Sequence, residues 1–185
     1  LTGRIVDEAG SERVRDDAGT PDLDQIKGLV REIIERSPDG LVGGIGVGIS
    51  GIVSRRRGTS VKFPRCDTWA DVPLARLLHE QFGVPVWLDN DVQAATLGEL
   101  RFGAGRSADN FVYLHLGEGI ALGLVTAGRL YLGSNGNVGE LGHTIIQPDG
   151  PICYCGNYGC LESLASPPAI VRQAQEAISA AGVES

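Results

Sequence analysis

The sequence of 185 residues lacks any apolar run long enough for a membrane-spanning helix, which needs about 20 consecutive apolar residues. It also lacks an opening charged stretch followed by an apolar segment, so we expect no signal peptide. Cysteine is scarce, with four residues. So few cysteines do not suggest a disulfide-rich secreted domain, and we expect a cytoplasmic protein with no membrane partner.

Basic residues are also few, with 16 lysines and arginines against 23 acidic residues, and the net charge is -7. A segment that itself grips nucleic acid needs a clustered positive face, so this composition argues against that function. The only basic run is Arg55-Arg56-Arg57, which precedes Gly58 between two strand-like stretches. We expect it to be a solvated hairpin tip rather than a phosphate-binding patch.

The cysteines that are present are concentrated in one span. Cys153, Cys155 and Cys160 follow His143, and this set supplies the Cys₃His count of a closed tetrahedral zinc site. Glycines between the cysteines allow the sharp turns that three converging thiolates need. The spacing C-x-C-x₄-C is unusual for a zinc finger, so a disulfide with a spare thiol, or buried cysteines, are alternatives at this point.

The wider pattern is more specific. Gly139-Glu-Leu-Gly-His143, followed by C-x-C-G-x-x-G-C-L-E over 153–162, resembles the zinc-containing signature of the ROK family of repressors, open reading frames and sugar kinases. The resemblance covers nearly the full chain and implies a zinc ion on His143, Cys153, Cys155 and Cys160. It also implies that the histidine binds zinc through one ring nitrogen and a sugar through the other.

The resemblance implies an α/β, actin-like ATPase fold of the ribonuclease-H-like type, with two lobes. An N-terminal lobe would occupy residues 1–107 and the start of a C-terminal lobe residues 108–185, with Ser107-Ala108-Asp109 as a hinge. ROK domains also have a phosphate-binding strand of the type D-x-G-x-T before this region and further elements after it. We therefore expect a fragment that is truncated at both ends.

Periodicity predicts the elements of the first half. The pattern indicates a hairpin over 1–17, a helix over 21–36 capped by Thr20, and one buried strand over 41–53. The strand's glycines, Gly46, Gly48 and Gly51, would allow a backbone or a ligand to approach closely, although ordinary sheet packing explains them equally well.

The second half is predicted in the same way. We expect a helix over 69–82 ending at Gly83, a short strand over 84–88 and a following helix. An antiparallel meander should span 110–132, and Ser166 should cap a last helix. The residues of this last helix that we expect to face inward are Ile170, Val171, Ala174, Ala177 and Ile178.

Polar residues at the end of the predicted strand over 84–88 form a candidate ligand site, since ligands bind at the carboxyl ends of strands in α/β sheets. Asp91 has a plain alternative role as a helix cap. The sequence Asn90-Asp91 resembles the N-D pair of ROK proteins, which implies a sugar contact for Asn90. It implies for Asp91 a sugar contact and, in a kinase, the general base that activates the attacking hydroxyl.

Two further acids match sugar-binding positions of the family. Glu140 and Glu162 are placed by the resemblance against adjacent sugar hydroxyls, although each could instead be a solvated surface acid. The family has another sugar-binding asparagine after a proline, but here Pro64 is followed by Arg65.

A sharper departure lies at the phosphate loop. ROK kinases typically have L-G-T-G-I-G-G-G, whereas this chain has Leu116-Gly117-Glu118-Gly119-Ile-Ala-Leu-Gly123. Glu118 would repel the phosphates of ATP, and the two side chains of Ala121 and Leu122 lie where the backbone must approach closely. Gly117, Glu118 and Gly119 are therefore a degenerate phosphate loop.

These observations favour the sugar-sensing domain of a repressor-branch ROK regulator, whose helix-turn-helix would lie upstream and bind DNA. Its partners would be a sugar or sugar phosphate and further copies of itself, as a dimer or tetramer. The alternative is an ATP-dependent sugar kinase of the glucokinase or N-acetylhexosamine kinase type, with ATP and Mg²⁺ as cofactors. A third alternative is a zinc-stabilised dimerisation module that binds no ligand.

Overall fold

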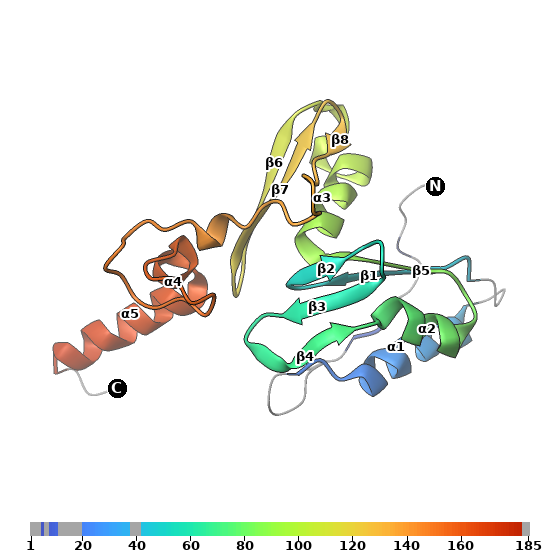
Figure 1. Ribbon diagram of the computed structural model, residues 1–185, viewed down its shortest axis with the longest axis horizontal. Coiled ribbons are helices and arrows are strands. Elements are labelled where there is room, and N and C mark those ends of the chain that lie inside the picture. Colours follow the sequence, from blue (N-terminus) through green and yellow to red (C-terminus); the bar gives the residue numbers. More distant parts are fainter. Residues whose placement is uncertain (1–4, 6–7, 11–19, 38–41, 183–185) are drawn as a thin grey trace. The chain divides into compact units, whose positions relative to one another are not determined.

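The computed structural model describes residues 5, 8–10, 20–37 and 42–182 (Figure 1). The predicted hairpin over 1–17 lies almost wholly outside these residues. The chain forms two compact units, Leu1–Arg106 and Ser107–Ser185. Within the described part of the chain, no helix combines the length and the apolar character that crossing a membrane requires.

Unit 1 contains three α-helices and five strands among its described residues. They are α1 (Leu23–Arg36), β1 (Ile45–Ile49), β2 (Ile52–Ser54), β3 (Thr59–Phe63), β4 (Cys66–Val72), α2 (Leu74–Phe82), β5 (Val86–Asn90) and α3 (Asp91–Phe102). Strands β1 and β5 pair in parallel, and β2, β3 and β4 form an antiparallel sheet. A short 3₁₀ helix, η1 (Ala104–Ser107), follows at the boundary of the two units.

The first helix begins two residues later than predicted. The side chain of Asp22 accepts hydrogen bonds from the backbone of Asp24 and Gln25, so Asp22 is the N-cap and Thr20 is not. A carboxylate at this position also has a favourable interaction with the helix dipole. The Thr20 hydroxyl instead lies 2.9 Å from that of Thr68.

The apolar run over 41–53 is not one strand but parts of two, β1 and β2, which belong to different sheets. Gly51 lies between them with a φ of 92°. A Cβ at Gly51 would lie 2.2 Å from the carbonyl oxygen of Lys62, so only glycine fits this reversal. The expectation of a close backbone approach is therefore confirmed at Gly51, and the periodicity of the run did not show the break.

The predicted helix over 69–82 is wrong in its first part, because β4 continues to Val72 and α2 begins at Leu74. Trp69 is buried in the sheet, and its indole Nε1 donates to the Ser60 hydroxyl at 2.9 Å. Pro73 separates the strand from the helix and occupies its N-cap position. The predicted stop is confirmed, since Gly83 is left-handed with a φ of 70°.

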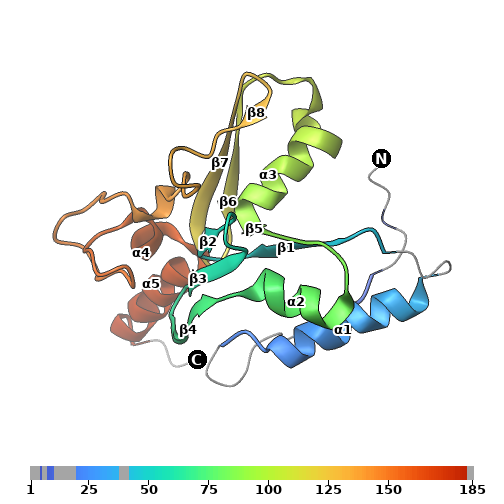
Figure 2. The same cartoon turned by 45° about the vertical axis from the view of Figure 1, so that its right-hand side comes forward.

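The core of unit 1 lies between the strands and the two helices α1 and α2, which lie side by side (Figures 1 and 2). Helix α3 lies on the other side of β1 and β5. The parallel register places Gly48 opposite Asp89 and Ile49 opposite Asn90. The turn that follows β1 therefore lies beside the start of α3, where Asn90 and Asp91 are.

Unit 2 contains the predicted antiparallel meander, formed by β6 (Phe111–Leu116), β7 (Ile120–Thr126) and β8 (Arg129–Leu130). A 3₁₀ helix η2 (Leu141–His143), a long loop, α4 (Leu161–Ala165) and α5 (Pro167–Ala180) follow. Ser166 caps α5, as predicted. The predicted inward apolar face of α5 is wrong for this chain, because Ile170, Val171 and Ile178 are each about half exposed or more.

Candidate functional site

Four side chains of unit 2 converge on one point. The Nδ1 or Nε2 of His143 and the sulfurs of Cys153, Cys155 and Cys160 all lie within 4.8 Å of one another. The Sγ of Cys153 lies 3.6 Å from His143 Nδ1, and the Sγ atoms of Cys155 and Cys160 are 3.7 Å apart. All three cysteines are free thiols, so the structure has no disulfide in this cluster.

These distances fit a tetrahedral metal. Zinc bonds of about 2.3 Å to sulfur and about 2.0 Å to nitrogen give tetrahedral edges of roughly 3.8 Å between sulfurs and roughly 3.5 Å between sulfur and nitrogen. The separations of 3.6 Å and 3.7 Å are already near these values. A pair as far apart as 4.8 Å, within which all four atoms lie, would have to contract by about 1 Å.

The loop that carries the cysteines depends on two glycines in the left-handed region, Gly156 and Gly159, with φ of 94° and 62°. A Cβ at Gly159 would lie 1.5 Å from the carbonyl oxygen of Gln147, so no other residue fits there. The backbone of Gly156 donates to the carbonyl of Cys153 at 2.9 Å, which closes the turn between the first ligands.

The thiols differ in acidity. Burial raises the pKa of Cys160 to about 12, with further increases from the side chains of Cys155 and Cys153, and burial also raises the pKa of Cys153. Burial would raise the pKa of Cys155 as well, but hydrogen bonds from the backbone of Asn157 and from the other two thiols lower it overall. Without a cation, the cluster therefore resists forming three thiolates, whereas a bound cation would favour all three.

The two ring nitrogens of His143 face different groups. Nδ1 is the nitrogen next to Cys153, and Nε2 lies 3.1 Å from the hydroxyl of Tyr154 and 3.7 Å from a carboxylate oxygen of Glu140. The rings of His143 and Tyr154 meet edge to face with centroids 5.1 Å apart. One nitrogen is thus turned to the thiols while the other is available for recognition of a polar group.

Glu162, the second residue of α4, is not a solvated surface acid. Its side chain is buried, and Oε2 accepts a hydrogen bond of 2.9 Å from the backbone N–H of Ile120 at the start of β7. A Cβ at Gly119 or at Gly142 would lie within 3.0 Å of the same oxygen. Glu162 therefore packs beneath both the β6–β7 turn and the segment that carries His143.

Asn90 and Asp91 lie in unit 1, at the junction of β5 and α3. The Asn90 amide oxygen caps α3 by accepting from the backbone of Val92 and Gln93, and its Nδ2 donates to the carbonyl of Gly51 at 3.2 Å. Asp91 accepts from the backbone N–H of Val92 at 2.9 Å and from the hydroxyl of Ser50. The residue that caps the helix is thus chiefly Asn90, which leaves the Asp91 carboxylate held by two donors.

Arg55 is not a solvated hairpin residue, although 55–58 do form the β2–β3 turn. Its guanidinium binds both carboxylate oxygens of Asp89, with Nε 2.6 Å from Oδ1. The same Oδ1 accepts from the backbone N–H of Asn90 at 2.8 Å. This pair fixes the turn into α3 that presents Asn90 and Asp91.

The structure thus brings Glu140, His143 and Glu162 into one region of unit 2, and Asn90 and Asp91 together in unit 1. That all five share one cleft stays a prediction. Sequence reasoning missed Tyr154 and Ser50. The signal for Tyr154 was its position between two ligand cysteines, and that for Ser50 its position between glycines at the end of β1.

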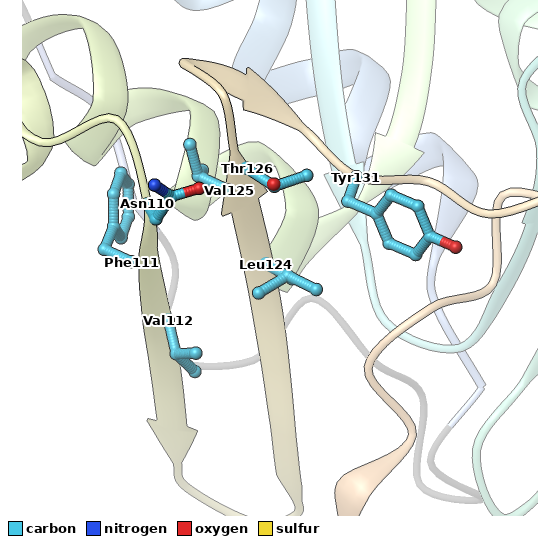
Figure 3. Close-up of a pocket in the computed structure, with 7 residues that line it drawn as sticks. All are labelled: Asn110, Phe111, Val112, Leu124, Val125, Thr126 and Tyr131. Carbon is cyan, nitrogen blue, oxygen red and sulfur yellow. The ribbon is translucent and has the colours of Figure 1, made fainter.

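A shallow hollow of about 390 Å³ lies elsewhere on unit 2, over β6 and β7 (Figure 3). Its lining is mostly apolar and includes none of the predicted site residues. The residues that line it are Asn110, Phe111, Val112, Leu124, Val125, Thr126 and Tyr131.

Comparison with known proteins agrees with the signature. The model of the ROK family matches residues 2–184. A glucokinase of Thermotoga maritima is 42% identical over 83% of this chain and 48% of its own length. A xylose repressor of Caldicellulosiruptor bescii is 36% identical over 81% of this chain and 39% of its own length.

Solved structures of ROK proteins also match this chain. A ROK family glucokinase from Streptomyces griseus, in complex with glucose and AMPPNP, superimposes with a TM-score of 0.76 and 36% identity. The match covers 85% of this chain and 49% of that one. The chain therefore spans 39% to 49% of the length of these relatives, and it has the α/β, actin-like fold of ROK sugar kinases. It belongs to the ROK family.

Proposed function

We propose that this chain is the zinc-containing, sugar-sensing part of a ROK transcriptional regulator, in which sugar binding changes how another part of the protein binds DNA. The observation that carries the proposal is the β6–β7 turn, where a kinase must hold the phosphates of ATP. In this chain the turn has a glutamate at its centre, Glu118, and that side chain is exposed.

The backbone of this turn also supports the proposal. A phosphate cradle uses free backbone N–H groups. Here the N–H of Gly117 donates to the Gly119 carbonyl at 3.0 Å, that of Ile120 to Glu162, and that of Leu122 to the Gly139 carbonyl at 2.8 Å. Several N–H groups from 117 to 122 are thus already used within the protein.

The charge of Glu118 adds an electrostatic cost. A like charge about 4 Å from a phosphate costs roughly 1 to 4 kcal/mol for effective dielectrics between those of water and a protein surface. That range weakens nucleotide binding by roughly five- to a thousand-fold. Slow or absent phosphoryl transfer follows, since this reaction depends on positioning and neutralising the phosphates.

The sugar side of the site keeps most of the family's recognition groups, although Arg65 stands where the family has a sugar-binding asparagine after a proline. Glu140 and Glu162 are carboxylates that can each accept charge-assisted hydrogen bonds from sugar hydroxyls, and His143 offers a ring nitrogen beside them. Asn90 and Asp91 would contact the same sugar from unit 1. We infer a neutral hexose or pentose as the ligand class, in keeping with the glucose and xylose of the relatives' names.

Zinc is the metal that best suits three thiolates and one imidazole. When bound, it would supply a fixed anchor for the loop 153–160 and hold the His143 ring in one orientation. The sugar itself would be bound and oriented by protein side chains, namely His143, Glu140 and Glu162. As in the family, we expect the whole protein to assemble as a dimer or tetramer.

The alternative function is an ATP-dependent sugar kinase, which would need Mg²⁺. One observation favours it: the Asp91 carboxylate, to which the family resemblance assigns the role of general base, accepts hydrogen bonds from the Ser50 hydroxyl and the Val92 N–H, which hold it in one orientation. Glu118 is the main objection, and the rate of turnover with a sugar, ATP and Mg²⁺ decides between the two functions.

The regulator is tested with the full-length protein and sheared genomic DNA from its source. Bound fragments are sequenced, and release of a selected fragment is followed by fluorescence anisotropy during titration with D-glucose and D-xylose. We expect sequence-selective binding that one sugar changes at least several-fold, and a Glu162→Gln variant that no longer responds. A Glu80→Gln variant, altered at an exposed position of α2, is the matched control. Absence of any sequence-selective DNA binding would contradict the proposal.

A further inference from the structure

We propose that Tyr154 is an intramolecular competitor for the sugar: its hydroxyl occupies the recognition nitrogen of His143, and a sugar hydroxyl must displace it. The inference rests on the proposed function, since it concerns how the same site selects its ligand. It is carried by contacts within unit 2 alone, among His143, Glu140, Tyr154 and the neighbouring cysteines.

The tautomer of His143 follows from its surroundings. Nδ1 is the nitrogen that faces Cys153 Sγ at 3.6 Å, so Nδ1 presents the lone pair to the centre of the cluster. A neutral imidazole that gives the lone pair of Nδ1 to a metal carries its proton on Nε2. Nε2–H is therefore a single hydrogen-bond donor pointing away from the thiols.

That donor already has an acceptor. The Tyr154 oxygen lies 3.1 Å from Nε2, within hydrogen-bonding distance, whereas the nearest Glu140 carboxylate oxygen lies at 3.7 Å and is too far for a direct bond. One N–H makes one strong hydrogen bond. A sugar hydroxyl that uses Nε2 must therefore take the place of the phenol hydroxyl.

The position of Tyr154 allows its side chain to rotate. Its backbone lies between the ligand residues Cys153 and Cys155, and the residue is 43% exposed. Rotation about its side-chain bonds would release Nε2, and water would then hydrate the phenol hydroxyl. The edge-to-face contact with His143, at 5.1 Å between centroids, returns the ring to its resting position.

The cost of displacement sets the expected effect. A hydrogen bond between neutral groups contributes about 0.5 to 1.5 kcal/mol net. Removing the competing hydroxyl should thus tighten sugar binding by about two- to tenfold, since 1.4 kcal/mol is a factor of ten. Loss of an ordinary sugar contact, or damage to the loop, would have the opposite sign.

The test measures D-glucose and D-xylose binding to the zinc-loaded full-length protein by calorimetry, for wild type and for Tyr154→Phe. The matched control is Tyr158→Phe, a more exposed tyrosine of the same loop. Zinc content is measured for all three proteins. We expect Tyr154→Phe to bind the sugar about two- to tenfold more tightly, Tyr158→Phe to match wild type, and zinc to stay at one equivalent.

Any of three other results would overturn the inference about Tyr154. Unchanged or weaker binding by Tyr154→Phe, with zinc retained, would overturn the inference and leave the proposed function standing. Equal tightening in both variants would also overturn it, because the effect would then not depend on His143. If the wild-type protein binds neither sugar nor any of a panel of hexoses, pentoses and N-acetylhexosamines, the proposed function fails, and the inference fails with it.

Discussion

At the scale of single residues, Glu162 combines two tasks that a substitution can separate. Its carboxylate satisfies the buried N–H of Ile120 and, in our proposal, accepts from the sugar. Glu162→Ala leaves that N–H without its acceptor, so we expect the free energy of unfolding to fall by about 1 to 3 kcal/mol. Glu162→Gln keeps an acceptor and should unfold closer to wild type. Urea denaturation measures both, and equal losses for the two variants would contradict this role.

The thiols of the cluster give a prediction on pH. The pKa of Cys160, about 12, and the raised pKa of Cys153 mean that both thiols hold protons at neutral pH when no metal is bound. Zinc must displace these protons, so zinc affinity should fall as the pH falls.

We expect the logarithm of the zinc affinity to rise by about two to three per pH unit between roughly pH 6 and 8, one for each thiol that loses a proton. Competition with a chromophoric chelator measures it. Cys66→Ser should leave the slope unchanged, because Cys66 lies in unit 1 and outside the cluster. A slope of one or less would show that fewer thiols bind the metal.

At the scale of elements, sequence patterns located most elements and several of their ends, but not the starts of α1 and α2 or the break at Gly51. The meander over 110–132 and the cap at Ser166 were confirmed because turns and caps are local chemistry. The start of α2 was missed because Val72, at the end of β4, fits the helical spacing of Leu74 and Leu78. The pattern therefore extended the predicted helix back into the strand that contains Trp69. Burial of Trp69 against Ser60 is a tertiary contact, and no local pattern encodes it.

The residues of the candidate site also divide into those that local sequence predicts and those that only tertiary contacts reveal. The ligand set of the cluster could be predicted because its residues are close in sequence and chemically distinctive. Tyr154 and Ser50 could not, since their roles depend on which atoms His143 and Asp91 turn towards them. The misplaced inward face of α5 has a related cause: periodicity identifies an apolar face but not what covers it.

Helix α2 gives a stability prediction for unit 1. Leu78 is fully buried in the core, whereas Leu97 of α3 is 40% exposed. We expect Leu78→Ala to lower the free energy of unfolding by about 2 to 5 kcal/mol, through lost burial and the cavity left behind. Leu97→Ala should cost about 1 kcal/mol or less. Similar losses for both variants in urea denaturation would contradict the core assigned to unit 1.

At the scale of the whole molecule, we propose that one residue of each unit, Asp91 and Glu140, binds the same sugar. Asp91 of unit 1 and Glu140 of unit 2 should each accept a charge-assisted hydrogen bond from the sugar, worth about 1.5 to 3 kcal/mol. We therefore expect Asp91→Asn and Glu140→Gln each to weaken sugar binding by about ten- to a hundredfold. Calorimetry measures this, with Asp67→Asn as the exposed control. A loss confined to the variants of one unit would contradict a shared site.

The central claim is that this ROK protein binds a sugar without transferring phosphate to it efficiently. The most direct measurement determines, on one preparation of zinc-loaded full-length protein, the affinity for each sugar by calorimetry and the turnover with ATP and Mg²⁺ by a coupled assay. We predict saturable sugar binding with a turnover far below the range of about 1 to 100 per second that is typical of kinases. Turnover within that range on any hexose or N-acetylhexosamine would contradict the account, and the protein would then be a sugar kinase.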